Sequence, residues 1–439
     1  MTRAPVRWWL PLLPMISLVP MAFAQIADDT AERTAAVMAE LEPFQTPDDF
    51  FPILPWDPLR GWNDETGPAD VLEGIAECNF TMAGFVKPAD LPACEALGLK
   101  ALVFGTAGRG PLKRDEWKKL SNEEIDAFFK QVVEDAGDSD AILGYYLLDE
   151  PGAGLFPKLA AGVAAVKKYA PGKLAYINLF PGYATIGAPD MSQLETQTFN
   201  EYLERFVTEV KPQLISYDDY MVQYSMDLEN PGRASRYFID LLEVRGVARK
   251  YGLPFWNIVS SNQIRAHTTI PSPANLAMQA YTTLAAGGRG VTWYTYNARG
   301  YGYAPIDKHG NRTMTWQYLQ MVNRQVKTLG PIMNGMRSTG VYFTSPAPVE
   351  SAPLLPGEVV RGLKTDVPMM LGEFIAHDGA RWAMVVNLSL QKSAKVALDL
   401  QEGYQQGTVI SAEDGSELGM EEGNAVWLVA GQGALIKVR

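Results

Sequence analysis

Histidine and cysteine are scarce in this chain. Among its 439 residues there are three histidines (His267, His309 and His377) and two cysteines (Cys78 and Cys94). No HxH, HExxH or CxxC motif can be assembled from them, so zinc hydrolases, zinc fingers and thioredoxin-type redox proteins are excluded. We therefore expect neither a metal site nor a cofactor.

Basic residues are outnumbered by acidic ones. The chain has 38 Lys and Arg against 50 Asp and Glu, a formal charge of −12 at pH 7. A protein that binds nucleic acid needs a basic face to displace counterions from the phosphate backbone, so this balance argues against a nucleic-acid partner. The remaining composition, 47% hydrophobic and 20% charged, is that of an ordinary globular protein.

Only the N-terminus carries a long apolar run. It covers residues 8–24, follows Arg3 and Arg7, and ends in Ala22-Phe23-Ala24. A basic start, a short apolar stretch and an A-x-A site are typical of a secretory signal peptide. The alternative, a membrane anchor, needs about 20 apolar residues, and this run is shorter and interrupted by prolines. We expect residues 1–24 to be removed, leaving a periplasmic or secreted protein without a membrane segment.

An exported protein can form disulfides, and Cys78–Cys94 is the only pair available within this chain. The alternative is two buried free thiols. The sequence does not distinguish the two, and it does not determine the oligomeric state.

Residues 50–337 alternate between short apolar runs and amphipathic stretches. The runs are apolar on both faces, as parallel strands covered by helices are, and the segment 121–135 between two of them opens with a Ser-x-x-Glu capping box. We expect an α/β fold, a (β/α)8 TIM barrel. An open doubly wound sheet is the alternative, but no Gly-x-Gly-x-x-Gly follows the first strand. The expected strands are 51–56, 79–85, 100–105, 142–148, 174–180, 213–217, 254–260 and 289–296.

Two further parts flank this region. Residues 25–49 are polar and helix-forming and read as a leader to the fold. Residues 338–439 contain little helical pattern and several short segments that alternate or run apolar, which predicts a small antiparallel β-sandwich. Its expected strands are 339–343, 382–388, 394–400, 407–411 and 425–438.

Acids, amides and aromatic residues follow the expected strands at the end where TIM barrels carry their active sites. Rings stack on the apolar faces of sugars, amides and acids bind sugar hydroxyls, and a pair of carboxyls can cleave a glycosidic bond. Each residue also has a structural alternative, because acids cap loops and rings fill barrel cores. The candidate catalytic residues are Glu150, Asp218 and Asp219. The candidate substrate-binding residues are Asp57, Trp56, Asp149, Asn178, Tyr220, Asn257, Trp293 and Tyr296.

Three stretches resemble TIM-barrel glycoside hydrolases. Residues 144–151 (GYYLLDEP) look like the fourth-strand motif of these enzymes, and residues 279–296 are similar to their last helix and strand. The tail from Val385 to Gly433 resembles the β-sandwich that often follows such barrels. The resemblance covers about 50–439 and implies that Glu150 is the general acid.

The sequence departs from the retaining members of this group at the seventh strand. Those enzymes carry a nucleophilic Glu there, whereas this chain has Ser260, Ser261 and Asn262. No Glu occurs between Glu243 and Glu350. The second carboxyl must come from another strand. Asp218 is our first choice and Asp219 the second, with Asp57 and Asp307 behind them.

We therefore expect an exported glycoside hydrolase whose partner is an oligo- or polysaccharide substrate. A non-catalytic carbohydrate-binding protein on a degenerate barrel is the main alternative, favoured by the missing seventh-strand Glu. A periplasmic solute-binding protein would need two lobes with crossing hinge strands. A serine hydrolase would need a Gly-x-Ser-x-Gly elbow, which is absent.

Overall fold

The computed structural model describes residues 31–56, 70–185, 192–224 and 231–439. The predicted signal peptide and Asp57 lie outside the described residues. The chain divides into two units, 1–40 and 41–439. In the first unit, residues 31–40 form a helix; the second unit contains the rest of the described structure. No helix among the described residues has both the length and the apolar composition to cross a membrane.

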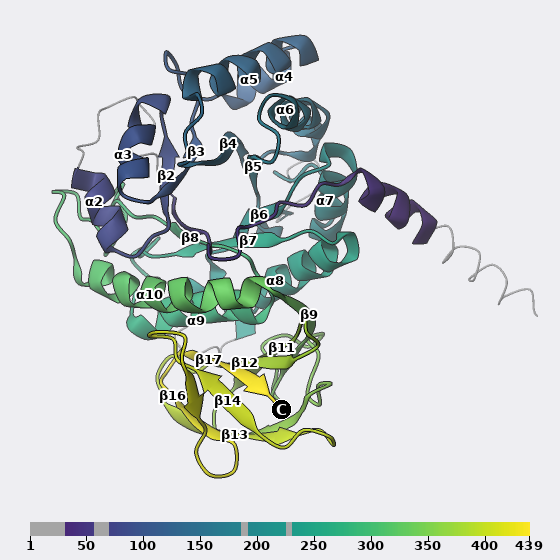
Figure 1. Cartoon of the computed structure of the whole chain (residues 1–439), viewed down its shortest axis with the longest axis vertical. Coiled ribbons are helices and arrows are strands. Elements are labelled where there is room, and N and C mark those ends of the chain that lie inside the picture. Colours follow the sequence, from purple (N-terminus) through teal and green to yellow (C-terminus); the bar gives the residue numbers. More distant parts are fainter. Residues whose placement is uncertain (1–30, 57–69, 186–191, 225–230) are drawn as a thin grey trace, which may run out of the picture. The chain divides into compact units, whose positions relative to one another are not determined.

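Eight parallel strands form the predicted TIM barrel, with helices outside them (Figure 1). Each predicted barrel strand is present, shortened or shifted by a few residues. Strands β1 and β8 are paired, and Thr81, just before β2, joins β1 to β2. Its Oγ1 accepts from the Ile53 backbone N–H (2.8 Å) and its own N–H donates to the Ile53 carbonyl (3.3 Å). The strands are β1 Ile53–Pro55, β2 Met82–Val86, β3 Lys100–Val103, β4 Ile142–Asp149, β5 Leu174–Leu179, β6 Ile215–Asp218, β7 Phe255–Ser260 and β8 Val291–Tyr294.

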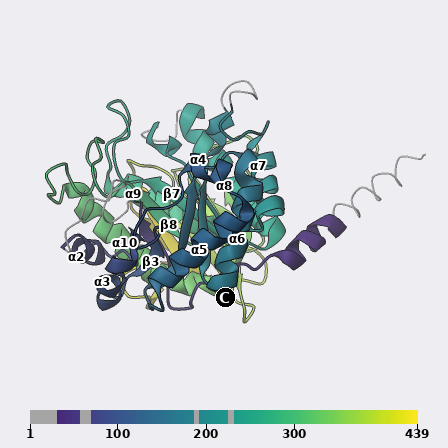
Figure 2. The ribbon, with the colours of Figure 1, turned by 90° about the horizontal axis from the view of Figure 1, so that it is seen from above.

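Helices cover the outer face of the barrel, as the view in Figure 2 also shows. The predicted capping box is confirmed: Ser121 Oγ accepts from the Glu124 backbone N–H, and Glu124 accepts from the Ser121 N–H (2.7 Å). The helices of this layer are α2 Asp70–Glu77, α3 Leu91–Ala96, α4 Arg114–Lys119, α5 Asn122–Ala136, α6 Phe156–Tyr169, α7 Phe199–Arg205, α8 Pro231–Tyr251, α9 Pro273–Ala285 and α10 Met314–Asn334.

Aromatic side chains fill the interior of the barrel. Trp56 packs edge-on against Phe85, with ring centroids 4.8 Å apart, and Tyr176 lies 5.7 Å from Trp256. All four rings belong to one buried cluster with aliphatic residues from most of the barrel strands. Because this core fills the barrel, a ligand can reach the strands only at their ends.

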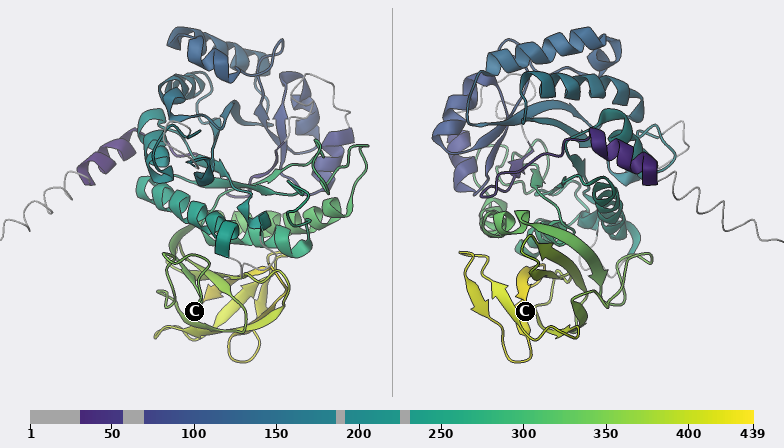
Figure 3. Two further views of the ribbon diagram at one scale, coloured as in Figure 1. Left: turned by 180° about the vertical axis from the view of Figure 1, so that it is seen from behind. Right: turned by 45° about the vertical axis from the view of Figure 1, so that its right-hand side comes forward.

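Two antiparallel sheets form the predicted β-sandwich, seen below the barrel in both views of Figure 3. One sheet has the order β10-β13-β16 and the other β15-β14-β17-β12-β11-β9. The strands are β9 Met336–Phe343, β10 Val360–Lys364, β11 Met369–Ala376, β12 Arg381–Asn387, β13 Ala394–Leu400, β14 Gly407–Ile410, β15 Glu417–Gly419, β16 Ala425–Leu428 and β17 Gly433–Val438.

Strands β10, β11 and β15 were missed by the sequence analysis. Strand β11 has an acid, Glu373, at its centre, and this side chain is fully buried. Its carboxylate accepts from the backbone N–H groups of Glu358, Val359 and Val360 at 2.8–2.9 Å. A buried charge is tolerated when several hydrogen bonds replace those it made with water. The local sequence pattern does not predict which groups will make these hydrogen bonds.

Helix α9 packs against strands β11, β12 and β17 of the sandwich. Glycine permits this approach: a Cβ on Gly372 of β11 would collide with the Ala285 carbonyl at the end of α9. Gly433 of β17 faces the Tyr281 ring in the same way. At both glycines the helix lies too close to the sheet for a larger side chain on the strand.

We expect Gly372→Ala to lower stability by about 1–3 kcal/mol, because an added methyl in a filled contact must push backbone apart. Urea and thermal unfolding measure the effect. Gly419→Ala in exposed β15 is the matched control, since no atom lies within 4 Å of its Cβ position. Equal stability of the two variants would refute this account of the packing.

Both cysteines are free and buried in the structure. Cys78 follows α2 and Cys94 lies in α3, and burial raises the pKa of both thiols. Of the two alternatives left open by the sequence, the structure has the free thiols.

Candidate active site

A cavity of about 440 Å³ lies at the C-terminal ends of the barrel strands. Its walls come from the ends of β1, β4, β5, β6 and β8, from the loops that follow these strands and from the loop after β7. This is the face on which TIM barrels carry their active sites. The lining residues are Trp56, Asp149, Glu150, Asn178, Tyr183, Asp218, Tyr220, Met221, Ile264, Arg265, Tyr294 and Tyr301. Six of them were candidates from the sequence: Trp56, Asp149, Glu150, Asn178, Asp218 and Tyr220.

Asn178 joins the acids of this cavity. Its Nδ2 donates to Asp149 Oδ1 (2.9 Å) and to Asp218 Oδ1 (3.0 Å). Its Oδ1 accepts from Ser216 Oγ (3.2 Å). Glu150 lies near Asp218, since its charge raises the pKa of Asp218. Three carboxyl groups from two strands therefore meet in one wall of the cavity.

Burial raises the pKa of all three acids. The pKa of Asp149 rises to about 6, and that of Glu150 to about 7, where the charge of Asp149 adds to the effect of burial. The pKa of Asp218 is raised well above its ordinary value by burial and by the charge of Glu150.

Arg114 of α4 binds the backbone of Asp149 and Glu150. Its Nη2 donates to the carbonyl oxygens of Asp149 (3.1 Å) and Glu150 (2.7 Å), and its guanidinium lies over the Phe180 ring. The charge of Arg114 opposes the rise in the pKa of both acids. Glu150 has a positive φ of 47°, a conformation that costs about 1–3 kcal/mol outside glycine. Strained backbone of this kind clusters at functional sites.

Tyrosines also line the cavity. Tyr220 and Tyr294 are stacked, with centroids 5.1 Å apart and planes 28° apart. The Tyr294 and Tyr301 hydroxyls are hydrogen bonded at 3.0 Å. Tyr183, Met221, Ile264, Arg265, Tyr294 and Tyr301 were not among the sequence candidates. Tyr183 and Tyr294 could have been found, because both stand at strand ends in the sequence.

Three candidate binding residues face the helix layer instead of the cavity. The Trp293 indole donates to Asn323 of α10 (2.8 Å), and the Tyr296 hydroxyl accepts from the Trp316 indole of the same helix (3.1 Å). Asn257 Nδ2 donates to Thr283 of α9 (2.9 Å). All three are buried. We expected these three residues on the open rim, and this expectation was wrong. Successive side chains of a strand point to opposite faces, and these side chains point outward to the helices.

Asp219 also lies outside the cavity. Its Oδ1 accepts from the Met221 N–H (2.6 Å), and its carboxyl group is hydrogen bonded to that of Asp240 in α8. Asp240 in turn accepts from the Gly182 N–H (2.8 Å). Asp219 Oδ2 and Asp240 Oδ1 are buried and have no hydrogen-bond partner among the described residues. The pair thus ties together the loops after β5 and β6, which carry Tyr183 and Tyr220.

The remaining candidates are placed as follows. Asp307 caps an exposed turn, accepting from the N–H groups of His309 and Asn311. At the end of β7, Ser261 Oγ donates to the Thr295 carbonyl and Asn262 Nδ2 to the Tyr294 carbonyl, so these residues fix the end of β8. The described part of the chain contains no group of three or more His, Cys, Asp or Glu arranged for a metal.

The buried acids predict how stability depends on pH. Their pKa values are higher in the folded protein than in the unfolded chain, so the folded protein binds protons more tightly than the unfolded chain does. The resulting stabilisation is complete below about pH 4 and is lost as the pH rises through 6 to 7. We expect Tm to fall by roughly 3–6 °C between pH 5 and pH 8.

Thermal unfolding over this pH range is the measurement. Asp219→Asn should reduce the slope, because the amide can donate to Asp240 without a shared proton. Asp307→Asn should leave it unchanged, since Asp307 is exposed and its pKa is lowered. A Tm that is constant or rises with pH would contradict the burial of these acids.

Comparisons with known proteins place the fold. No protein-family model matches the chain, and no curated protein matches its sequence. Among solved structures, Gan42B, a GH42 β-galactosidase, matches with a TM-score of 0.62 at 8% identity, over 90% of this chain and 99% of that chain. A catalytic mutant of Gan42B from G. stearothermophilus matches with a TM-score of 0.61 at 8% identity, over 91% and 100%.

A β-galactosidase from the psychrophilic Marinomonas ef1 matches at 10% identity over 66% of this chain, with a TM-score of 0.46. The chain spans 63% of the length of that enzyme. The match to Gan42B extends over nearly the whole of both chains, barrel and sandwich together. This protein therefore has the TIM-barrel and β-sandwich fold of the GH42 β-galactosidase.

Proposed function

We propose that this protein is a glycoside hydrolase that cleaves an oligo- or polysaccharide. One observation carries the proposal: three carboxyl groups with raised pKa values, those of Asp149, Glu150 and Asp218, meet in an open cavity faced by tyrosine rings. Acids that retain a proton near neutral pH are what glycosidic cleavage requires of its general acid. The fold shared with a β-galactosidase supports the same reaction class.

Glu150 acts as the general acid and Asp218 as the base or nucleophile. Glu150 gives its proton to the glycosidic oxygen as the bond between that oxygen and the anomeric carbon breaks. Asp218 either attacks that carbon directly or takes a proton from the attacking water.

The neighbouring side chains bind the sugar. Asp149 supplies an acceptor for ring hydroxyls, and Asn178 positions Asp149 and Asp218 through its two N–H groups. The stacked Tyr220 and Tyr294 offer an aromatic face to the apolar side of a sugar ring. Trp56, just after β1, also lines the cavity. We further propose that the N-terminal signal peptide exports the protein to the periplasm or the medium, where such a substrate is found.

Hydrolysis of a panel of substrates tests the proposal. Aryl glycosides that differ in sugar and anomer, including aryl β-galactosides because of the structural neighbour, are incubated with the purified protein together with reduced oligosaccharides. Release of aglycone or shorter products supports the hydrolase. Products that appear equally in a mock preparation without the protein would come from a contaminant and would count against hydrolysis.

A carbohydrate-binding protein without activity is the second candidate. It is favoured by the end of β7, where Ser261 and Asn262 hold the β8 backbone and no carboxyl is present. Saturable binding of an oligosaccharide with no turnover, in wild type and in Glu150→Gln alike, would select this function over hydrolysis.

A further inference from the structure

A second cavity lies at the opposite end of the barrel, where the start of β7, the residues before β8 and the first residues of β9 meet the end of α8. Its volume is about 370 Å³. The charged residues in its lining are four arginines, with no acid among the described lining residues: Arg245, Arg249, Arg289 and Arg337. We call it the arginine cavity. Figure 1 shows β9 leaving the barrel beside α8 at this place.

Two of the arginines are held in place by the fold. Arg289 donates to the Met333 carbonyl (2.6 Å) and to that of Met336, which ties the end of α10 to β9. Arg245 donates from Nη2 to Ser338 Oγ (3.1 Å), while its Nε is buried without an acceptor among the described residues. Burial lowers the pKa of both guanidinium groups to about 10, and for Arg245 the charge of Arg249 adds to this effect.

Helix ends explain only part of this charge. The helices α8, α9 and α10 end at or near the cavity, and each C-terminus carries about half a negative charge. Together they offset about 1.5 of the four positive charges, which leaves an excess of about 2.5. Arg289 reaches a helix-end carbonyl, but Arg245 does not bond one. Basic side chains placed only to cap helices would not leave a buried N–H without a partner.

We propose that the arginine cavity binds a small multivalent oxyanion, and that this oxyanion is a phosphate group. Guanidinium groups bind such anions through paired, parallel hydrogen bonds, which lysine cannot form. The anion would supply the acceptor that Arg245 Nε lacks and offset the repulsion between Arg245 and Arg249. The cavity is larger than a single phosphate ion, so a phosphate carried by a small sugar also fits the chemistry.

Isothermal titration of the purified protein with inorganic phosphate, in a low-chloride buffer, tests the site. A parallel titration with glucose 6-phosphate distinguishes a free anion from a phosphorylated sugar. The compound that binds with the lower Kd identifies which of the two the cavity recognises. We expect one saturable site. Arg249→Ala and Arg337→Ala, at exposed positions, should each weaken binding about tenfold, the effect of one charge-assisted hydrogen bond.

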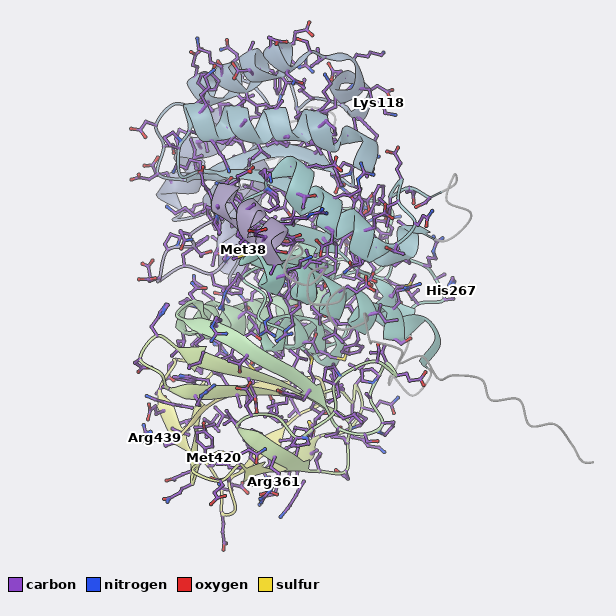
Figure 4. The ribbon with its side chains drawn as sticks, turned by 90° about the vertical axis from the view of Figure 1, so that its right-hand side faces the viewer. Met38, Lys118, His267, Arg361, Met420 and Arg439 are labelled. Carbon is purple, nitrogen blue, oxygen red and sulfur yellow. The ribbon has the colours of Figure 1, made fainter. Side chains whose placement is uncertain are left out.

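Arg361→Ala is the matched control. Arg361 is exposed on β10, pairs with Asp399 (2.6 Å), and is seen on the sandwich at the end away from the barrel in Figure 4. Its loss should leave the affinity for phosphate unchanged. Thermal unfolding gives a second readout, since phosphate should raise Tm beyond sodium chloride of equal ionic strength. The absence of saturable binding, or equal weakening by all three variants, would overturn the proposal.

Discussion

Glu150→Gln is expected to lower kcat by a factor on the order of 10²–10⁴, the contribution of one acid–base group. Glutamine has the same shape, but it has no proton to give to a leaving oxygen. The loss should be greatest for substrates with a poor leaving group, because these need protonation most. Rates on an alkyl and an activated aryl glycoside of the same sugar measure the difference.

The pH profile gives an independent check on Glu150. With the pKa of Glu150 raised to about 7, kcat/KM of the wild type should fall above this pH as the acid loses its proton. Glu150→Gln should lack this alkaline limb. Because the variant removes a carboxyl that resists ionisation, its Tm at pH 8 should equal or exceed that of the wild type.

Glu134→Gln provides the matched control. Glu134 is an exposed residue of α5 that pairs with Lys130, and its replacement should alter neither rate nor pH profile. If Glu150→Gln hydrolysed its best substrate at a rate close to that of the wild type, Glu150 would not be the acid. A uniform loss on good and poor leaving groups would instead assign it another role.

Asp218→Asn is expected to cost a similar factor, on the order of 10²–10⁴ in kcat. Asp218 is 2% exposed, accepts from Asn178 and lies near Glu150, whose charge raises its pKa. An amide at this position can neither attack an anomeric carbon nor take a proton from water. Steady-state kinetics measure the loss, and NMR of the first product anomer decides between nucleophile and base.

The neighbouring residue supplies the sharpest comparison. Asp219→Asn changes the same side chain one position later, but this carboxyl faces Asp240 and lies outside the cavity. We expect its effect on kcat to stay within about tenfold and to be exceeded by its effect on the pH dependence of Tm. A larger kinetic loss for Asp219→Asn than for Asp218→Asn would exchange the two assignments.

Much of the fold could be read from local patterns. Apolar runs such as 142–148 and 174–180 coincide with β4 and β5, and the Ser121 capping box begins α5 where it was expected. These signals are local, since a strand buried on both faces must be apolar throughout. Strand β11 was not predicted from such patterns. The acid at its centre interrupts the apolar run, and it is stabilised by backbone N–H groups from residues 358–360.

The site was predicted at the level of the strand end but not always of the side chain. Asp149, Glu150 and Asp218 do line one cavity, whereas Trp293 faces α10 and its neighbour Tyr294 faces the cavity. A strand that is apolar on both faces does not reveal which of two successive residues points inward.

The sequence by itself determined the order of strands and helices, the sandwich that follows them, and which strand ends carry acids and rings. Tertiary structure alone decided the direction of each side chain at those ends, and with it the choice between Asp218 and Asp219. The physical reason is that side chains alternate along a strand. The phase of that alternation relative to the barrel interior is set by the stagger at which the strands close, a property of all eight together.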